Sequence, residues 1–169
     1  MHLREWAPFE ANAGLGTAGT KVKLSWVGTP QSFTTKVTRA EAPKVLEYGD
    51  LRWELEPLGS GTRLTLWHSI DRRFISWGAA GWHICFDVLE RYLADDRLGR
   101  IVGPEAMKFK GWQRLVAEYS KQFGGGCSQL ADASNSELVN RADHEGSHQT
   151  FNFSLGSHHL RHSDTRLHL

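Results

Sequence analysis

The chain lacks several features that would assign a protein to a class at once. Its two cysteines, Cys85 and Cys127, are too few for a disulfide scaffold, so we expect both to be reduced thiols. No run approaches the roughly 18 apolar residues that a membrane-spanning helix needs, and the opening MHLREWAPFEA has no apolar segment typical of a secretory signal. We therefore expect a cytoplasmic protein with no membrane partner.

An excess of charge of one sign is also lacking. The 20 Lys and Arg residues are balanced by 19 Asp and Glu residues, for a formal net charge of +1. Such a balance provides no strong field for nucleic acid or an anionic membrane, so neither is expected as a partner. The sequence has no nucleophile elbow, phosphate loop or dinucleotide fingerprint, and we predict no cofactor.

One formal metal-binding pattern is present, at residues 144–148 (HEGSH). It satisfies H-E-x-x-H, in which a helix places two imidazoles on one face beside a glutamate that activates a metal-bound water. The glycine and serine inside the pattern are poor helix formers, and the flanking NRAD and QTFN have no apolar stripe. Because six of the nine histidines lie between His144 and His168, we interpret the match as coincidental and predict no metal site.

Period-two alternation predicts a sheet in the first half of the chain. The segments TKVKLSWV, SFTTKVTR, LRWELEP and TRLTLWHS all alternate, and a shorter strand is predicted from Lys44 to Tyr48. Short glycine-containing turns separate them, which favours an antiparallel meander over parallel crossover units. The side chains predicted to face the interior are those of Val22, Leu24, Trp26, Phe33, Thr35, Val37, Leu51, Trp53, Leu55, Leu64, Leu66 and His68.

Two amphipathic helices are predicted after the strands. In the first, residues 77–94, an angular step of about 100° per residue separates a polar face that carries His83 and Asp87 from an apolar face. The second helix spans residues 108–123, and residues 124–169 show no sustained period, so we predict a disordered or weakly ordered tail. The apolar face of the first helix consists of Gly78, Trp82, Cys85, Leu89, Tyr92 and Leu93.

Three tryptophans are predicted to converge on one interior. Trp26 and Trp53 would face it from the sheet and Trp82 from the first helix, with Phe33 and Leu55 beside them. Such rings either pack closely with no void or line a pocket.

Two glycines and one histidine bear on that choice. Gly78 and Gly81, near the start of the first helix, would leave room for a pocket. His68 is then either its polar contact or general base, or a core histidine bonded to backbone or water.

Four segments carry a resemblance to a known family: VLEYGDLRWELEPLGSGTRLTLWHSIDRR, AAGWHICFDVLERYLA, GRIVG and GWQRLVAEYSKQFG. They resemble the SRPBCC superfamily, also called START-like or Bet v-like. Within it they are most similar to bacterial proteins grouped with the C-terminal domain of the activator of heat-shock-protein-90 ATPase. The resemblance covers about Leu3 to Gly124 and is most specific in LRWELEP with GTRLTL and in the AAGWH helix.

The resemblance implies an α+β helix-grip fold, in which a bent antiparallel sheet wraps around a long C-terminal helix and encloses a cavity. Members begin with a strand and short helix ahead of the residues that read LREWAPF here, so it implies that the first strand is missing and that a sheet edge is open to self-association. The tail has no counterpart in the family pattern. A fragment or a shifted reading frame would produce both departures.

The expected organisation is a helix-grip domain, residues 1–123, incomplete at its N-terminus, followed by a tail, residues 124–169. The expected function is non-enzymatic binding of a small hydrophobic or amphipathic ligand between the sheet and the long helix. The first alternative is a co-chaperone-like activator of heat-shock-protein-90 ATPase, as the resemblance implies, or another protein-interaction module. The second is a polyketide cyclase-like enzyme that uses His68. The predicted ligand-binding residues are Trp26, Phe33, Trp53, Leu55, Leu64, Leu66, His68, Gly78, Trp82, Cys85 and Leu89.

Overall fold

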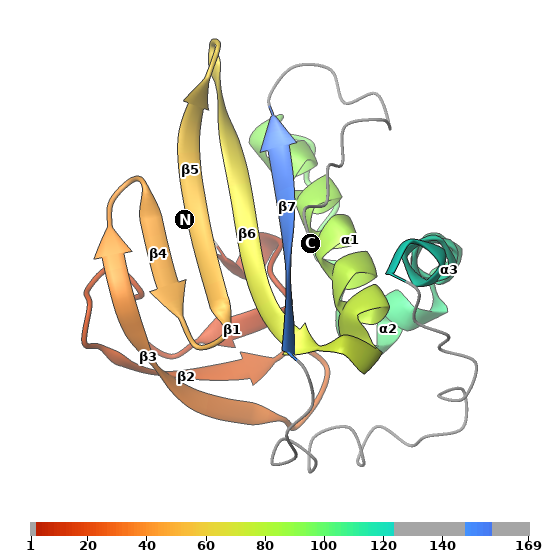
Figure 1. Cartoon of the computed structure of the whole chain (residues 1–169), viewed down its shortest axis with the longest axis horizontal. Coiled ribbons are helices and arrows are strands. Elements are labelled where there is room, and N and C mark those ends of the chain that lie inside the picture. Colours follow the sequence, from red (N-terminus) through yellow and green to blue (C-terminus); the bar gives the residue numbers. More distant parts are fainter. Residues whose placement is uncertain (1–2, 124–147, 157–169) are drawn as a thin grey trace.

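The computed structural model describes residues 3–123 and 148–156, the latter as backbone only. Figure 1 shows a bent sheet with helices against one side of it. The strands are β1 (Phe9–Ala11), β2 (Lys21–Trp26), β3 (Ser32–Glu41), β4 (Val45–Tyr48), β5 (Leu51–Leu58), β6 (Gly61–Asp71) and β7 (His148–Gly156). The helices are α1 (Ile75–Leu93), α2 (Gly103–Lys108) and α3 (Lys110–Phe123), with short 3-10 turns η1 (Leu3–Glu5) and η2 (Arg72–Phe74).

The sheet is an antiparallel meander in which the described strands lie in the order β1 to β7. It bends between β1–β3 and the upright strands β4–β7, and α1 runs along β6 and β7, with α3 packed on α1 (Figure 1). The fold is therefore α+β, with a curved antiparallel sheet gripping a long helix, as predicted. None of the helices in the described part of the chain is both long and apolar enough to cross a membrane.

The predicted turns and alternation account for the local structure of β5 and β6. Gly59 takes a positive φ of 58° in the two-residue loop Gly59-Ser60 that joins the two strands, a conformation that glycine adopts without steric cost. In β6, Leu64 and Leu66 are buried, whereas the preceding Arg63 is exposed and the intervening Thr65 is half-buried. One face of the sheet is thus committed to the interior.

A cluster of aromatic rings fills the space between the sheet and α1. Trp53 on β5 meets Trp82 on α1 edge-on, with ring centroids 5.2 Å apart. Trp6, which is 1% exposed, lies between Trp53 at 5.8 Å and Phe86 of α1 at 6.2 Å. Phe9 of β1 meets Trp82 at 6.1 Å. The opening segment, residues 3–9, therefore contributes central rings to the core.

The predicted inward face is wrong at three positions. Trp26 and Phe33 are 37% and 40% exposed, because they lie near the ends of β2 and β3. The ring of Trp26 meets those of Phe9 and Phe33 there. Leu93 is 76% exposed because α1 ends at this residue, beyond the region where the sheet and α3 cover it.

The prediction that His83 faces water is also wrong. Its ring nitrogen Nδ1 lies 2.8 Å from the hydroxyl of Tyr119 on α3, and its side chain is 24% exposed. Helix α1 is covered on two sides, by the sheet and by α3, so a polar stripe on this helix does not mark solvent.

The predicted tail contains regular structure. Strand β7 pairs with β6 over nine positions, from Arg63 opposite Gly156 to Asp71 opposite His148. The remainder of the tail, with Cys127 and the first four residues of the HEGSH pattern, lies outside the described residues. Because β7 covers the outer side of β6, the described sheet has β1 and β7 at its two edges.

Candidate ligand-binding cavity

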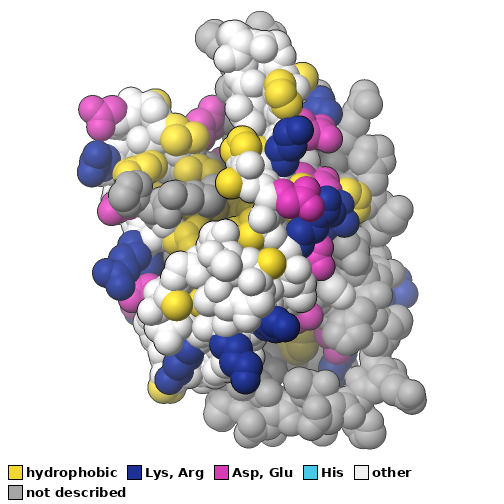
Figure 2. All heavy atoms as spheres, turned by 90° about the vertical axis from the view of Figure 1, so that its left-hand side faces the viewer, with side chains coloured by type: hydrophobic (Ala, Val, Ile, Leu, Met, Phe, Trp, Pro, Cys, Tyr) yellow, Lys and Arg dark blue, Asp and Glu magenta, His cyan; other side chains and the backbone are white. Residues whose placement is uncertain are grey.

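A cavity of about 720 Å³ opens on the concave side of the sheet, next to η1. Figure 2 looks onto this side of the molecule, where hydrophobic side chains gather around a hollow. The cavity is lined by Leu3, Arg4, Glu5, Ala11, Ala13, Gly14, Leu15, Gly16, Ala40, Glu41, Ala42, Pro43, Lys44, Val45, Leu46, Tyr48, Trp53, Leu55 and Leu64.

The floor of the cavity consists of inward-facing residues from four neighbouring strands. Ala40 of β3 lies opposite Leu46 of β4, and Leu46 lies opposite Trp53 of β5. Leu55 of β5 in turn lies opposite Leu64 of β6. Residues directly opposite in an antiparallel ladder point to the same face, so the register alone places these five side chains on one surface.

The wall opposite the floor comes from the start of the chain. Leu3, Leu15 and the exposed Gly14 and Gly16 lie along the cavity, and a Cβ atom added to either glycine would meet nothing within 4 Å. The buried ring of Trp6 follows directly after η1 and holds this wall against the core. The part of the wall that precedes β1, with Leu3, therefore depends on the packing of Trp6.

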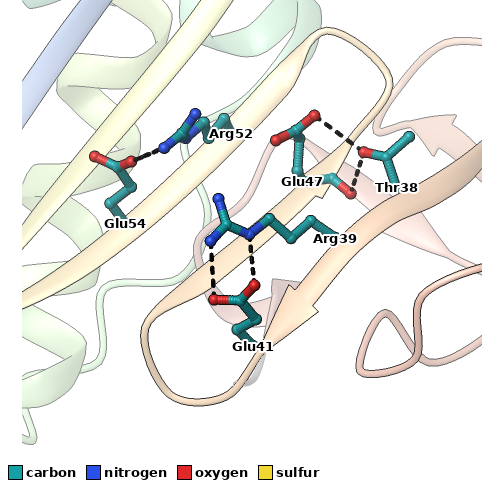
Figure 3. Close-up of polar contacts among 6 residues, drawn as sticks. All are labelled: Thr38, Arg39, Glu41, Glu47, Arg52 and Glu54. Carbon is teal, nitrogen blue, oxygen red and sulfur yellow. Dashed lines mark hydrogen bonds and ion pairs between the residues drawn. The ribbon is translucent and has the colours of Figure 1, made fainter.

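Three polar contacts join side chains of the strands that form the floor. Figure 3 shows the guanidinium of Arg39 donating to both carboxylate oxygens of Glu41, at 2.7 and 2.9 Å, and the Thr38 hydroxyl bonding to Glu47. Arg52 pairs with Glu54 in the same view. Both ion pairs lie within one strand, β3 or β5, and as surface pairs each contributes at most about 1 kcal/mol. The bond from Thr38 to Glu47 joins β3 to β4.

A hydrogen-bonded tyrosine–tryptophan pair lies among the residues that line the cavity. The Trp53 indole Nε1 donates a hydrogen bond of 3.1 Å to the Tyr48 hydroxyl, and both residues line the cavity. Tyr48 is 1% exposed, and this burial raises the pKa of its hydroxyl well above the ordinary value. The hydroxyl is therefore neutral and retains its proton at physiological pH.

The rim carries charges of both signs. Arg4, Lys44 and Glu41 are exposed and Glu5 is half-buried, so two basic and two acidic side chains border the opening. Glu41 is already paired with Arg39, a surface ion pair that holds its pKa below the ordinary value. The rim has no excess of either charge with which to attract an ion.

The structure brings three of the predicted ligand-binding residues to the cavity: Trp53, Leu55 and Leu64. The other eight lie elsewhere among the described residues. Four of them are buried in the core: Leu66, Trp82, Cys85 and Leu89. Gly78 is half-buried on α1, and His68 is partly buried beside Trp82. The side chains of Trp26 and Phe33 are exposed to solvent by more than a third.

His68 occupies a core position rather than the cavity wall. Its Nδ1 accepts a 3.2 Å hydrogen bond from the indole of Trp82, and burial lowers the pKa of its imidazole to about 4. An imidazole that is neutral at physiological pH and used as an acceptor within the core has little capacity as a general base there.

Sequence reasoning missed Tyr48, Leu46, Ala40 and Leu15 as cavity residues. The signal for the first two was the alternation within the short strand, which places Leu46 and Tyr48 on one face. No local sequence pattern predicts the position of Leu15 or of the cavity wall, because that position depends on how the start of the chain packs over the sheet.

Comparison of the chain with protein-family models, with curated proteins and with solved structures finds no match in any of the three. Over the described residues, no group of three or more His, Cys, Asp or Glu residues is placed to hold a metal ion. The class of protein therefore rests on the architecture, a helix-grip-like α+β fold with an apolar cavity on the concave side of its sheet.

Proposed function

We propose that the protein binds a small apolar or amphipathic molecule in the cavity between strands β3–β6 and the opening segment. The observation that carries this proposal is the cavity itself. Its volume of about 720 Å³ lies within the roughly 300–1,000 Å³ of typical small-molecule sites, and its floor is built from aliphatic and aromatic side chains. An occupant would be removed from water on several sides, which favours apolar surface.

The resemblance to the SRPBCC superfamily supports the same proposal. Residues 3–124 resemble proteins of that superfamily, which include lipid and polyketide binders with a cavity in a helix-grip fold. The position differs from the sequence expectation, because the rings of Trp6, Trp53, Trp82 and Phe86 occupy the space between sheet and α1. The cavity is lined instead by η1, Trp53 and other residues of the opening segment and of β3–β6.

The composition of the cavity lining favours binding over catalysis. Among the described residues that line it there is no histidine, cysteine, serine or threonine. The acidic and basic side chains are at the rim rather than beside the apolar floor. The lining thus offers shape and apolar contact but no nucleophile with an adjacent base.

A cavity-filling substitution tests the proposal. N-phenylnaphthylamine, a neutral fluorophore whose emission rises in apolar surroundings, should bind saturably to the wild-type protein. Ala40→Phe places a ring on the floor of the cavity and should weaken this binding about tenfold or more. Ala117→Phe, on the exposed face of α3, is the matched control and should bind the probe as the wild type does.

Circular dichroism must show that both variants remain folded. Equal affinity in the wild type and in folded Ala40→Phe would place the probe elsewhere and overturn the proposal. Absence of probe binding to the folded wild type would count against it equally.

A further inference from the structure

Where β2 pairs with β3, over residues 21–25 and 32–36, the outer face of the sheet carries three lysines and no acidic side chain. Lys21 and Lys23 of β2 and Lys36 of β3 are exposed, whereas Val22 and Leu24, which point to the other face, are buried. Lys21 lies directly opposite Lys36. Such positions place Cβ atoms about 5 Å apart across the strands and about 7 Å apart along one strand. The three ammonium groups therefore share one small surface.

These lysines differ from the basic residues on the rest of the outer face. Arg39, Arg52 and Arg63 each form an ion pair with a glutamate of the same or the neighbouring strand. None of the ion pairs within residues 3–123 includes one of the three lysines. On the adjacent strand β1, Glu10 is bonded to Arg100 at 2.9 Å. The β2–β3 face is thus a basic surface whose charge the described residues leave uncompensated.

The cross-strand lysine pair has an energetic consequence. Like charges directly opposite in an antiparallel ladder repel and destabilise it, so Lys21 and Lys36 weaken the pairing of their own strands. An anionic group bound over the pair removes this repulsion. An acidic partner therefore gains more at this position than at an isolated surface lysine.

The other side chains of the face indicate the kind of partner. Between the lysines lie the hydroxyls of Ser25, Ser32 and Thr34, and over these paired residues the outer face has no apolar or aromatic side chain. It thus offers nothing to insert into a bilayer and no ring on which a base could stack. The spacing of about 7 Å along β2 equals that of side chains at alternate positions of an extended peptide. These features favour an acidic peptide over a membrane or a nucleic acid.

We propose that the outer face of β2 and β3 docks an extended acidic segment of a partner protein, with Lys21, Lys23 and Lys36 each contacting a carboxylate. The surface is on the face of the sheet opposite to the cavity, so the inference is independent of the proposed function. Exposed ion pairs contribute about 1.4- to fivefold in affinity each, so the contact is weak by itself and sensitive to salt.

A peptide of alternating glutamate and threonine is the probe. Added to the ¹⁵N-labelled full chain at about 0.01 M salt, where the Debye length is roughly 30 Å, it should cause saturable amide shifts concentrated in residues 21–25 and 32–36. The affinity should fall when the salt is raised to about 0.15 M.

Two triple variants test the role of the lysines. Lys21→Gln/Lys23→Gln/Lys36→Gln should weaken peptide binding about threefold to a hundredfold. The matched control removes the same charge from α2 and α3, where all three lysines are exposed, and should bind the peptide as the wild type does. It is Lys108→Gln/Lys110→Gln/Lys121→Gln.

A charge reversal separates docking from folding. Lys36→Glu places opposite charges across the ladder from Lys21, so the midpoint of thermal unfolding should rise while peptide binding weakens more than in Lys36→Gln.

Three outcomes would overturn the proposal. The first is an equal loss of affinity in the two triple variants, which would assign the binding to net charge. The second is an absence of shifts in β2 and β3 of the folded wild type. The third is binding of a single-stranded oligonucleotide or of anionic vesicles at least as tightly as the peptide and with the same dependence on the three lysines, which would assign the surface to that partner.

Discussion

Replacing Trp6 with alanine tests whether the segment before β1 belongs to the core. The Trp6 side chain is 1% exposed and meets the ring of Trp53 at 5.8 Å and that of Phe86 at 6.2 Å. Truncation of a fully buried tryptophan removes its transfer free energy and leaves a cavity, which together cost about 3–5 kcal/mol. We expect Trp6→Ala to lower the free energy of unfolding by this amount.

Urea unfolding followed by far-ultraviolet circular dichroism measures the effect without relying on tryptophan emission. A fall in the midpoint with an unchanged slope would identify a loss of stability rather than a change in compactness. Trp26→Ala is the matched control: its side chain is 37% exposed, so the expected loss is smaller, about 1–2 kcal/mol.

The reasoning is refuted if Trp6→Ala destabilises the protein no more than Trp26→Ala does. In that case the opening segment would not be held against the sheet, and the wall of the cavity that includes Leu3 and Leu15 would lose its support.

Three further predictions concern single groups. Burial lowers the pKa of His68 to about 4 from 6.5, so the unfolded chain binds more protons than the folded chain between these values. The stability that this neutral imidazole contributes is therefore complete above pH 6.5 and is lost as the pH falls toward 4. His68→Gln should flatten this loss in thermal unfolding, and an equally steep loss would contradict it. Tyr119→Phe removes the 2.8 Å contact with the imidazole on α1 and should cost about 1 kcal/mol in urea unfolding, against little for Tyr92→Phe. In a Cys127→Ser background, the buried thiol of Cys85, whose pKa burial raises to about 12, should react with Ellman's reagent only after unfolding, and rapid labelling of the native protein would show that it is accessible.

The sheet and the long helix could be predicted because their signals are local. Alternation in LRWELEP and TRLTLWHS, with a glycine turn between them, predicted β5 and β6 and the burial of Trp53 and Leu64. The 3.6-residue period predicted α1 to within about two residues at each end. Each of these patterns depends only on neighbours along the chain.

The remaining features depend on contacts between distant segments. Trp6 precedes the first strand with no periodic pattern around it, yet it packs between β5 and α1. His83 lies on the polar side of α1 by helical angle, but α3 covers that side and provides Tyr119 as a partner. The position of the cavity differs from the prediction for the same reason. Aromatic packing fills the predicted space, and the cavity lies instead against Leu46 and the residues around it.

The order of the sheet has a kinetic consequence. From β1 to β6, every strand pairs with the strand next to it along the chain, and short turns close most of these pairs. Such local contacts form with little loss of chain entropy. Strand β7 is separated from β6 by the helices α1–α3 and by residues 124–147, so closing this pair costs more chain entropy. The cavity floor, built entirely from β3 to β6, is therefore assembled from the part of the chain expected to fold first, and the β6–β7 ladder is expected to close last.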